Sequence, residues 1–142
     1  ARALQPRTDY DTLRLHATLV WQGQPVHLSA LHPMPPLSSA YAQARDQALV
    51  DEALRLSQSG GLGVMAGDLN TTPWARGLWG AEQAQMRRAG PGVPTWPSAW
   101  GWLSVLPLDH VLASPGWQLV EAHTGPDLGS DHRPMVVRLV AR

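Results

Sequence analysis

Two segments near the start of the chain alternate apolar and polar residues with the period of two that a β-strand imposes. They cover residues 13–21 and 26–32, and the link QGQP at 22–25 has the glycine and proline of a turn. We therefore predict a β-hairpin. Four alternate residues of its second strand share one face: Val26, Leu28, Ala30 and His32. Because His32 extends an apolar row, we expect this face to be the core-facing one.

A helix follows the breaker stretch PMPP at 33–36. It is expected to begin after Ser38 or Ser39, which can act as N-cap, and to end before Gly60 and Gly61. Four apolar residues at helical spacing predict one buried stripe: Ala42, Leu49, Ala53 and Leu56.

A short apolar run at 62–68 follows the helix, and the order strand, helix, strand predicts a layered α/β sheet. Thr72 and Pro73 predict the start of a short helix that continues through Trp79. We interpret Arg87 and Arg88 as a solvated helix end. The segment 90–101, rich in proline and glycine, is expected to be an irregular loop, and further strands are predicted at 106–113, 117–123 and 134–140.

Composition excludes several classes of site. The chain has no cysteine, so disulfides, thiolate metal sites and cysteine nucleophiles are ruled out. Its 11 basic and 11 acidic residues give a net charge of zero, which disfavours a purely nucleic-acid-binding module. No apolar run reaches the ~18 residues of a membrane span. We interpret the chain as a single soluble segment whose compartment the sequence does not specify.

Polar residues gather where the predicted strands run into loops, the edge at which open α/β sheets place their ligands. They are His32, Asp68, Asn70, Asp109, Asp131 and His132. Taken singly, each has an ordinary structural explanation: a satisfied strand histidine, an Asx turn or a surface carboxylate. Together, carboxylates, an amide and imidazoles are the groups that phosphate-ester hydrolysis requires, for orienting water, binding a cation, donating to a phosphoryl oxygen and transferring protons.

Four ordered motifs carry a family resemblance: VMAGDLNTTPW at 64–74, TWP at 95–97, LDHVL at 108–112 and GSDHRP at 129–134. They resemble the endonuclease/exonuclease/phosphatase superfamily, the fold of DNase I, and most closely its bacterial, often membrane-anchored branch. The resemblance implies that residues 1–142 are a partial domain. They would form the C-terminal half of a four-layer α/β sandwich, with one mixed sheet and helices on its outer face.

The resemblance also implies a role for each polar residue. Asp68 would orient or activate the attacking water, His132 would be the essential imidazole, and Asp109 would orient it. His32 and Asn70 would contact the phosphate, and Asp131 would bind the metal. The oxygen-rich ligands favour Mg²⁺ or Mn²⁺.

The first half of the family fold normally carries an asparagine and a metal-binding glutamate. Neither has a counterpart here, because Asn70 is the only asparagine and the three glutamates lie in helical or late segments that do not match: Glu52, Glu82 and Glu121. We therefore expect a fragment of a metal-dependent phosphoesterase that is inactive by itself. The alternative is a degenerate, non-catalytic phosphate-binding module of the same fold. Nucleic acid, phospholipid and other phosphate esters stay open as substrates. The missing half should leave an apolar sheet face exposed and the isolated chain prone to self-association: the residues expected there are Val26, Leu28, Ala30, Val64 and Ala66.

Overall fold

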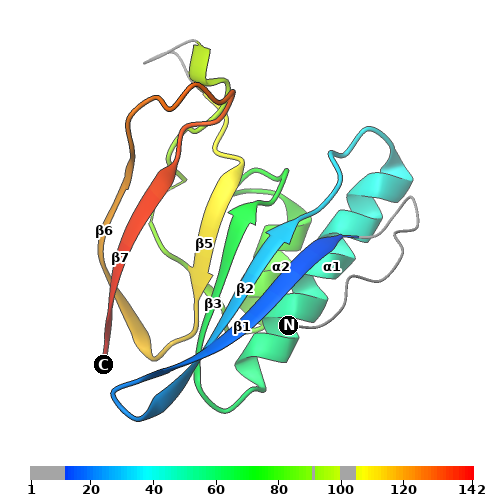
Figure 1. The fold of residues 1–142 in the computed structure, drawn as a ribbon. Helices are drawn as coiled ribbons and strands as arrows, with labels where there is room; N and C mark the ends of the chain where they lie inside the picture. Colours follow the sequence, from blue (N-terminus) through cyan, green and yellow to red (C-terminus); the bar gives the residue numbers. More distant parts are fainter. Residues whose placement is uncertain (1–11, 91, 100–104) are drawn as a thin grey trace.

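The computed structural model of the protein describes residues 12–90, 92–99 and 105–142. The elements, in chain order, are β1 (Leu13–Trp21), β2 (Gln24–His32), α1 (Ser39–Ser57), β3 (Leu62–Asp68), α2 (Arg76–Gln83), β4 (Arg87–Arg88), β5 (Asp109–Ala113), β6 (Trp117–Thr124) and β7 (Met135–Ala141). Five strands form one mixed sheet in the order β1-β2-β3-β5-β4, and β6 and β7 form a second, two-stranded sheet (Figure 1). No helix in the described ranges has the length and apolar character needed to cross a bilayer.

The first three strands follow the sequence prediction. Gln22 and Gly23 both have positive φ, +50° and +78°, as the two-residue turn of a twisted β-hairpin requires. Strand β2 then pairs with β3 in parallel, and α1 makes the crossover between them. The predicted mixed α/β fold is thereby confirmed.

Helix α1 begins and ends as its sequence predicts. The Ser38 hydroxyl caps it by accepting a hydrogen bond from the Tyr41 N–H at 3.2 Å. Its buried stripe includes Leu49, Ala53 and Leu56, all fully inaccessible to solvent. Each fully buried leucine stabilises the fold by roughly 1.5–3 kcal/mol.

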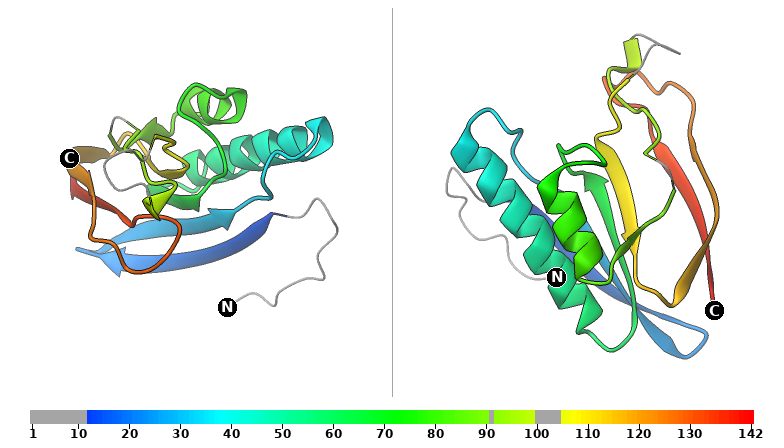
Figure 2. Two further views of the ribbon diagram at one scale, coloured as in Figure 1. Left: turned by 90° about the horizontal axis from the view of Figure 1, so that it is seen from above. Right: turned by 180° about the vertical axis from the view of Figure 1, so that it is seen from behind.

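The core lies between the two helices and one face of the larger sheet, as Figures 1 and 2 show. The sheet contributes Leu31, Met65 and Leu112 to it. These residues alternate with the row of Leu28, Ala30 and His32, so that row lies on the opposite face. The row therefore does not contact the helix-covered core; it belongs to the face on which these residues are expected to lack their partner sheet.

The face away from the helices is apolar and largely open. Ala30 is exposed and Leu28, Val64 and Ala66 are half-buried, as expected for a face without its partner sheet, whereas Val26 is buried. Strand β1 extends this face, because Leu15 lies opposite Ala30 in the register. The three leucines that β1 adds there are 41%, 68% and 52% exposed: Leu13, Leu15 and Leu19.

We expect this open face to drive self-association of the isolated chain, since large exposed apolar patches are rare on monomers. Light scattering at micromolar concentration checks it. Leu15→Lys should reduce the apparent mass. Leu54→Lys, which charges a 41%-exposed leucine on the helix side, should not. A monomeric native chain would contradict the expectation.

Several boundaries in the second half differ from the prediction. Helix α2 begins at Arg76 rather than at Pro73, because residues 73–75 form a turn in which the Ala75 N–H donates to Thr72 O. Arg87 and Arg88 form the short strand β4, which pairs with β5, and are not a helix end. Strand β5 begins at Asp109, since Leu106 makes only an isolated bridge to Trp96.

Candidate functional site

Strand register brings three of the predicted site residues to one end of the open face. Asp68 of β3 lies directly opposite Asp109 of β5. Ala30 of β2 lies beside Ala66 of β3, and His32 and Asp68 each lie two residues further along these parallel strands. Because side chains alternate with period two, all three project from the face away from the helices. The polar site therefore lies at one end of the open face, where the apolar rows of β2 and β3 end.

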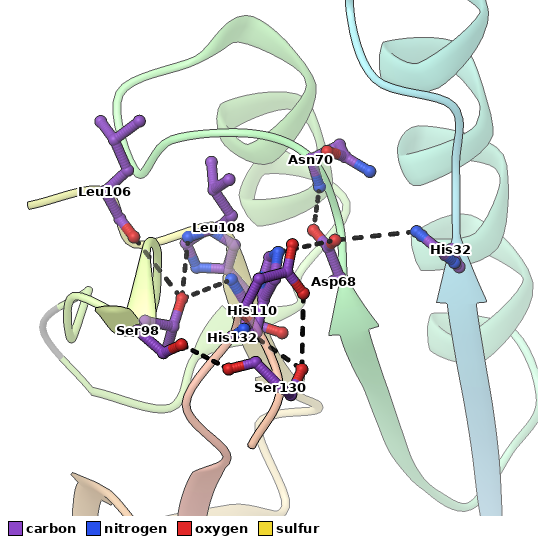
Figure 3. Close-up of polar contacts among 12 residues, drawn as sticks. His32, Asp68, Asn70, Ser98, Leu106, Leu108, His110, Ser130 and His132 are labelled. Atoms are coloured by element: carbon purple, nitrogen blue, oxygen red, sulfur yellow. Dashed lines mark hydrogen bonds and ion pairs between the residues drawn. The ribbon is translucent and has the colours of Figure 1, made fainter. Parts of the chain in front are cut away.

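His132 joins these residues from the segment that precedes β7 (Figure 3). Its Nδ1–H donates to Oδ2 of Asp109 at 2.8 Å, which fixes the imidazole ring and leaves Nε2 free to exchange a proton. His132 Nε2 lies 3.6 Å from Oδ2 of Asp68. The predicted hydrogen-bonded couple of His132 and Asp109 is thus present, with a second carboxylate on the far side of the ring.

The carboxylate of Asp68 lies at the centre of the site. Its Oδ2 is 3.6 Å from Nε2 of His132 and 3.7 Å from Nε2 of His32, whereas its Oδ1 accepts the Asn70 N–H at 2.9 Å. Both distances between an imidazole nitrogen and the Asp68 oxygen are longer than a hydrogen bond. A small side-chain movement or a bridging oxygen atom could therefore connect either histidine with Asp68. His32, Asp68, Asp109 and His132 therefore lie in one site, as their order along the chain predicted.

Asn70 lies in a turn directly beyond β3. Its φ is +47°, a conformation that asparagine tolerates better than most residues. One N–H of its side chain donates to Pro33 O, the residue after His32, at 3.0 Å. The amide has a second N–H, so its predicted contact with a phosphate oxygen stays a proposal.

Gly67 allows β3 to approach the end of β2 closely. Its φ is +150°, and a Cβ there would lie 2.0 Å from Leu31 O. Any larger residue would push β3 away from β2 just before Asp68 and His32.

The segment that carries Asp131 and His132 has no regular secondary structure. Gly129 has φ +80°, and the Ser98 N–H donates to Asp131 O at 2.8 Å while the Ser98 hydroxyl donates to Ser130 O. Asp131 itself is exposed, and its Oδ1 is 3.5 Å from the Ser130 hydroxyl.

Thr95 and His110 hold the backbone on either side of the site, and the sequence analysis assigned neither of them a role. The buried Thr95 hydroxyl is within 3.3 and 3.4 Å of the N–H groups of Leu108 and Asp109. His110 is buried and its Nε2–H donates to Thr71 O at 2.9 Å, just beyond Asn70. Burial lowers the pKa of His110, which keeps it neutral.

The electrostatics of His132 favour its charged form. Burial lowers the pKa of the imidazole, but the hydrogen bond to Asp109 and the charges of Asp109, Asp68 and Asp131 outweigh burial, so the pKa lies above 6.5. A raised imidazole pKa favours the protonated form that a general acid needs.

We expect NMR titration of His132 to give a midpoint above 6.5 and Asp109→Asn to lower it. Since the folded pKa is raised, the ion pair stabilises the fold fully below pH 6.5, and this contribution is lost as pH rises through the folded pKa. Asp51→Asn, which removes an exposed acid from α1, should leave the midpoint unchanged. A midpoint insensitive to Asp109→Asn would contradict the assignment.

Three of the described residues could contact one metal ion. Ligand atoms of Asp68, Asp109 and His132 lie within 4.8 Å of one another. The two carboxylates are the oxygen donors that hard divalent cations prefer, whereas an imidazole nitrogen ligates only in its neutral form. The carboxylate of Asp131, the predicted metal ligand, is not in this cluster. The chain thus fits a cation as part of a coordination shell.

A cleft of about 140 Å³ opens beside Asp109, between Ala66 and Gly67 of β3 and Met135 of β7. A second cavity of about 170 Å³ lies among Arg87, Trp117 and Arg142 and contains none of the candidate site residues. Of these two cavities, the first is therefore the one that borders a candidate site residue.

Known structures share this fold at low sequence identity. An endonuclease/exonuclease/phosphatase from Beutenbergia cavernae is 23% identical, with a TM-score of 0.68, over 90% of this chain and 39% of its own. A mannosyl-6-phosphatase from Bacteroides thetaiotaomicron is 14% identical, with a TM-score of 0.64, over 84% of this chain and 52% of its own. A humanized D. rerio TDP2 is 16% identical, with a TM-score of 0.72, over 92% of this chain and 61% of its own.

The chain therefore spans between 39% and 61% of these three structures. No curated protein sequence matches it. The model of the Endonuclease/Exonuclease/phosphatase family matches residues 2–132, nearly the whole chain. On this match the chain belongs to the endonuclease/exonuclease/phosphatase family, a family of phosphoester hydrolases.

Proposed function

We propose that the chain is the C-terminal half of a metal-dependent phosphoesterase that hydrolyses phosphate esters by in-line attack of an activated water. The observation that carries the proposal is the alignment of Asp109, His132 and Asp68: Nδ1 of the imidazole is 2.8 Å from one carboxylate and Nε2 is 3.6 Å from the other. A proton can leave or reach Nε2 while Asp109 holds the ring and stabilises its charge.

Each remaining residue has a role in this proposal. Asp68 orients the attacking water, since its Oδ1 is held by the Asn70 N–H and its Oδ2 faces the site. His32 lies at the rim with its side chain 61% exposed, where it can contact a phosphoryl oxygen, and the second side-chain N–H of Asn70 can do the same.

Asp68 would hold Mg²⁺ or Mn²⁺ together with ligands from the first half of the domain, and the cation would supply positive charge at the phosphate. Asp131, whose exposed carboxylate lies outside the cluster of Asp68, Asp109 and His132, would have to turn toward them to bind the same cation. Phosphate esters are the substrate class we propose, which includes nucleic acid and phospholipid. The mannosyl-6-phosphatase among the structural relatives supports the class without selecting a member.

The test is turnover of a nitrophenyl phosphodiester by the full-length parent protein with added Mg²⁺ or Mn²⁺. We expect His132→Ala to reduce turnover by about 10²–10⁴-fold. His123→Ala is the matched control, because His123 is an exposed histidine of β6 that pairs with Glu121. A parent that binds phosphate but is inactive with either metal would identify the degenerate module instead.

A further inference from the structure

Helix α1 carries a buried arginine that contacts the site from the helix side. Arg45 is 8% exposed, and its guanidinium donates from Nη1 to the backbone carbonyl of Asn70 at 2.7 Å. Its Nε and Nη2 donate to Oδ1 of Asp46 at 2.9 and 2.7 Å. All three contacts are charge-assisted hydrogen bonds, which are stronger than neutral ones.

The packing around Asp46 fixes the direction of this guanidinium. Gly77 of α2 lies against Asp46, where a Cβ would approach Asp46 Oδ1 to 2.5 Å. The close approach of α2 confines the Asp46 carboxylate, and this carboxylate accepts hydrogen bonds from two nitrogens of the Arg45 guanidinium, Nε and Nη2. Nη1 is then presented to the turn beyond β3. A lysine could not make both sets of contacts, because it lacks the planar fork.

The turn that Arg45 contacts is held at three points, all on Asn70. The Asn70 carbonyl accepts from Arg45, the side chain donates to Pro33 O at 3.0 Å, and the N–H donates to Oδ1 of Asp68 at 2.9 Å. The φ of +47° at Asn70 is unfavourable for most residues and persists where surrounding contacts impose it.

We propose that Arg45 is a positioning residue, which holds the Asn70 turn so that Asp68 faces His132 and His32. This inference rests on the proposed function for its catalytic meaning, since Arg45 acts through Asn70 and not on the substrate. Loss of the guanidinium frees the Asn70 carbonyl, and the turn can then relax toward negative φ. The Asn70 N–H would move away from Asp68, and Oδ2 of Asp68 would lose its orientation.

Because Asn70 is the only asparagine, asparagine labelled with ¹⁵N and ¹³C gives NMR signals from this turn alone. In Arg45→Gln we expect the Asn70 carbonyl resonance to shift. We expect exchange of its backbone N–H to become about ten- to hundredfold faster, the factor that corresponds to losing one hydrogen bond to a charged group. Arg45→Lys should restore part of this protection.

Arg55→Gln is the matched control: Arg55 is on the same helix and bonds a carboxylate, Glu52, but does not contact the turn. It should leave the Asn70 signals unchanged. The seven tryptophan indole signals report whether each variant is folded. If Arg45→Gln does not fold, Asp46→Asn replaces it and should shift the Asn70 carbonyl resonance. Unchanged Asn70 signals in a folded variant would overturn the proposal. Because these readouts need no turnover, they test the positioning separately from the proposed hydrolysis.

Discussion

The 142-residue chain by itself is expected to hydrolyse phosphodiesters very slowly, even with added Mg²⁺ or Mn²⁺. A hard cation needs about six oxygen ligands, and when held loosely it stays hydrated. The described residues offer one candidate cluster, with two carboxylates and an imidazole. Losing a fixed cation removes charge stabilisation of several kcal/mol, where about 1.4 kcal/mol is a factor of ten in rate. The couple of His132 and Asp109 can contribute roughly 10²–10⁴-fold, which is small against what phosphate esters require.

The measurement is turnover of a nitrophenyl phosphodiester by the chain and by its His132→Ala variant, with metal present. Robust activity that disappears in the variant would contradict the requirement for the missing half. It would mean that the chain, as an oligomer, completes a metal site from residues not assigned above.

Replacing Glu52 is expected to destabilise the fold more than any exposed charge substitution. Glu52 is 1% exposed and accepts hydrogen bonds from Ser29 at 2.8 Å and Arg55 at 2.6 Å, with His16 Nε2 at 3.1 Å. Breaking a buried ion pair costs about 3–5 kcal/mol. The side chains of Arg55 and His16 are 39% and 36% exposed, so water can hydrate them when Glu52 is replaced. We therefore expect the loss of unfolding free energy in Glu52→Gln to lie near the lower end of this range.

Urea unfolding measures this effect. The matched control is Glu82→Gln, because Glu82 pairs with Arg88 nearer the surface, where an ion pair contributes about 1 kcal/mol or less. Burial raises the pKa of Glu52, but hydrogen bonds from Arg55 and Ser29 and the charges of Arg55 and His16 bring it below 4.5. The contribution of Glu52 is therefore present above pH 4.5 and is lost as pH falls through the folded pKa. Equal stability of the two variants would contradict the prediction.

Local signals in the sequence predicted the elements that they specify directly. Three of these signals act over only a few residues: the turn at Gln22 and Gly23, the Ser38 cap and the apolar run of β3. The spacing of apolar residues and the identity of turn and cap residues are therefore enough to predict these elements. The site residues were found because polar groups at strand ends are unusual and their order matched known motifs. Strand parity then placed Asp68 and His32 on one face, as expected.

Tertiary packing decided the features that the sequence did not reveal. Arg45 and Glu52 lie at helical spacing from Leu49, on the buried side of α1, but charged residues are rarely buried. Both are buried because each has a partner from a distant segment, Asn70 for Arg45 and Ser29 for Glu52. The apolar pattern of β2 does not by itself select the helix-covered face, since both faces are partly apolar; the family resemblance placed Leu28 and Ala30 on the open face. Asp131 was assigned with the site, yet its carboxylate lies outside the cluster of ligand atoms.

The candidate site lies at the boundary between two sheets that share no β-ladder in the described part of the chain, with Asp68 and Asp109 in one sheet and His132 just before a strand of the other. Among the described residues β6 and β7 form a ladder only with each other, whereas Asp68 and Asp109 end strands of the larger sheet. Segments joined by few contacts open as separate cooperative units, at free energies below global unfolding. A fluctuation that separates β7 and also breaks the bonds of the preceding segment to Thr95 and Ser98 would carry His132 away from Asp109 and leave both carboxylates in place. The proposed acid and the carboxylate that orients it would thus belong to different cooperative units, and their hydrogen bond would depend on the contact between the two sheets.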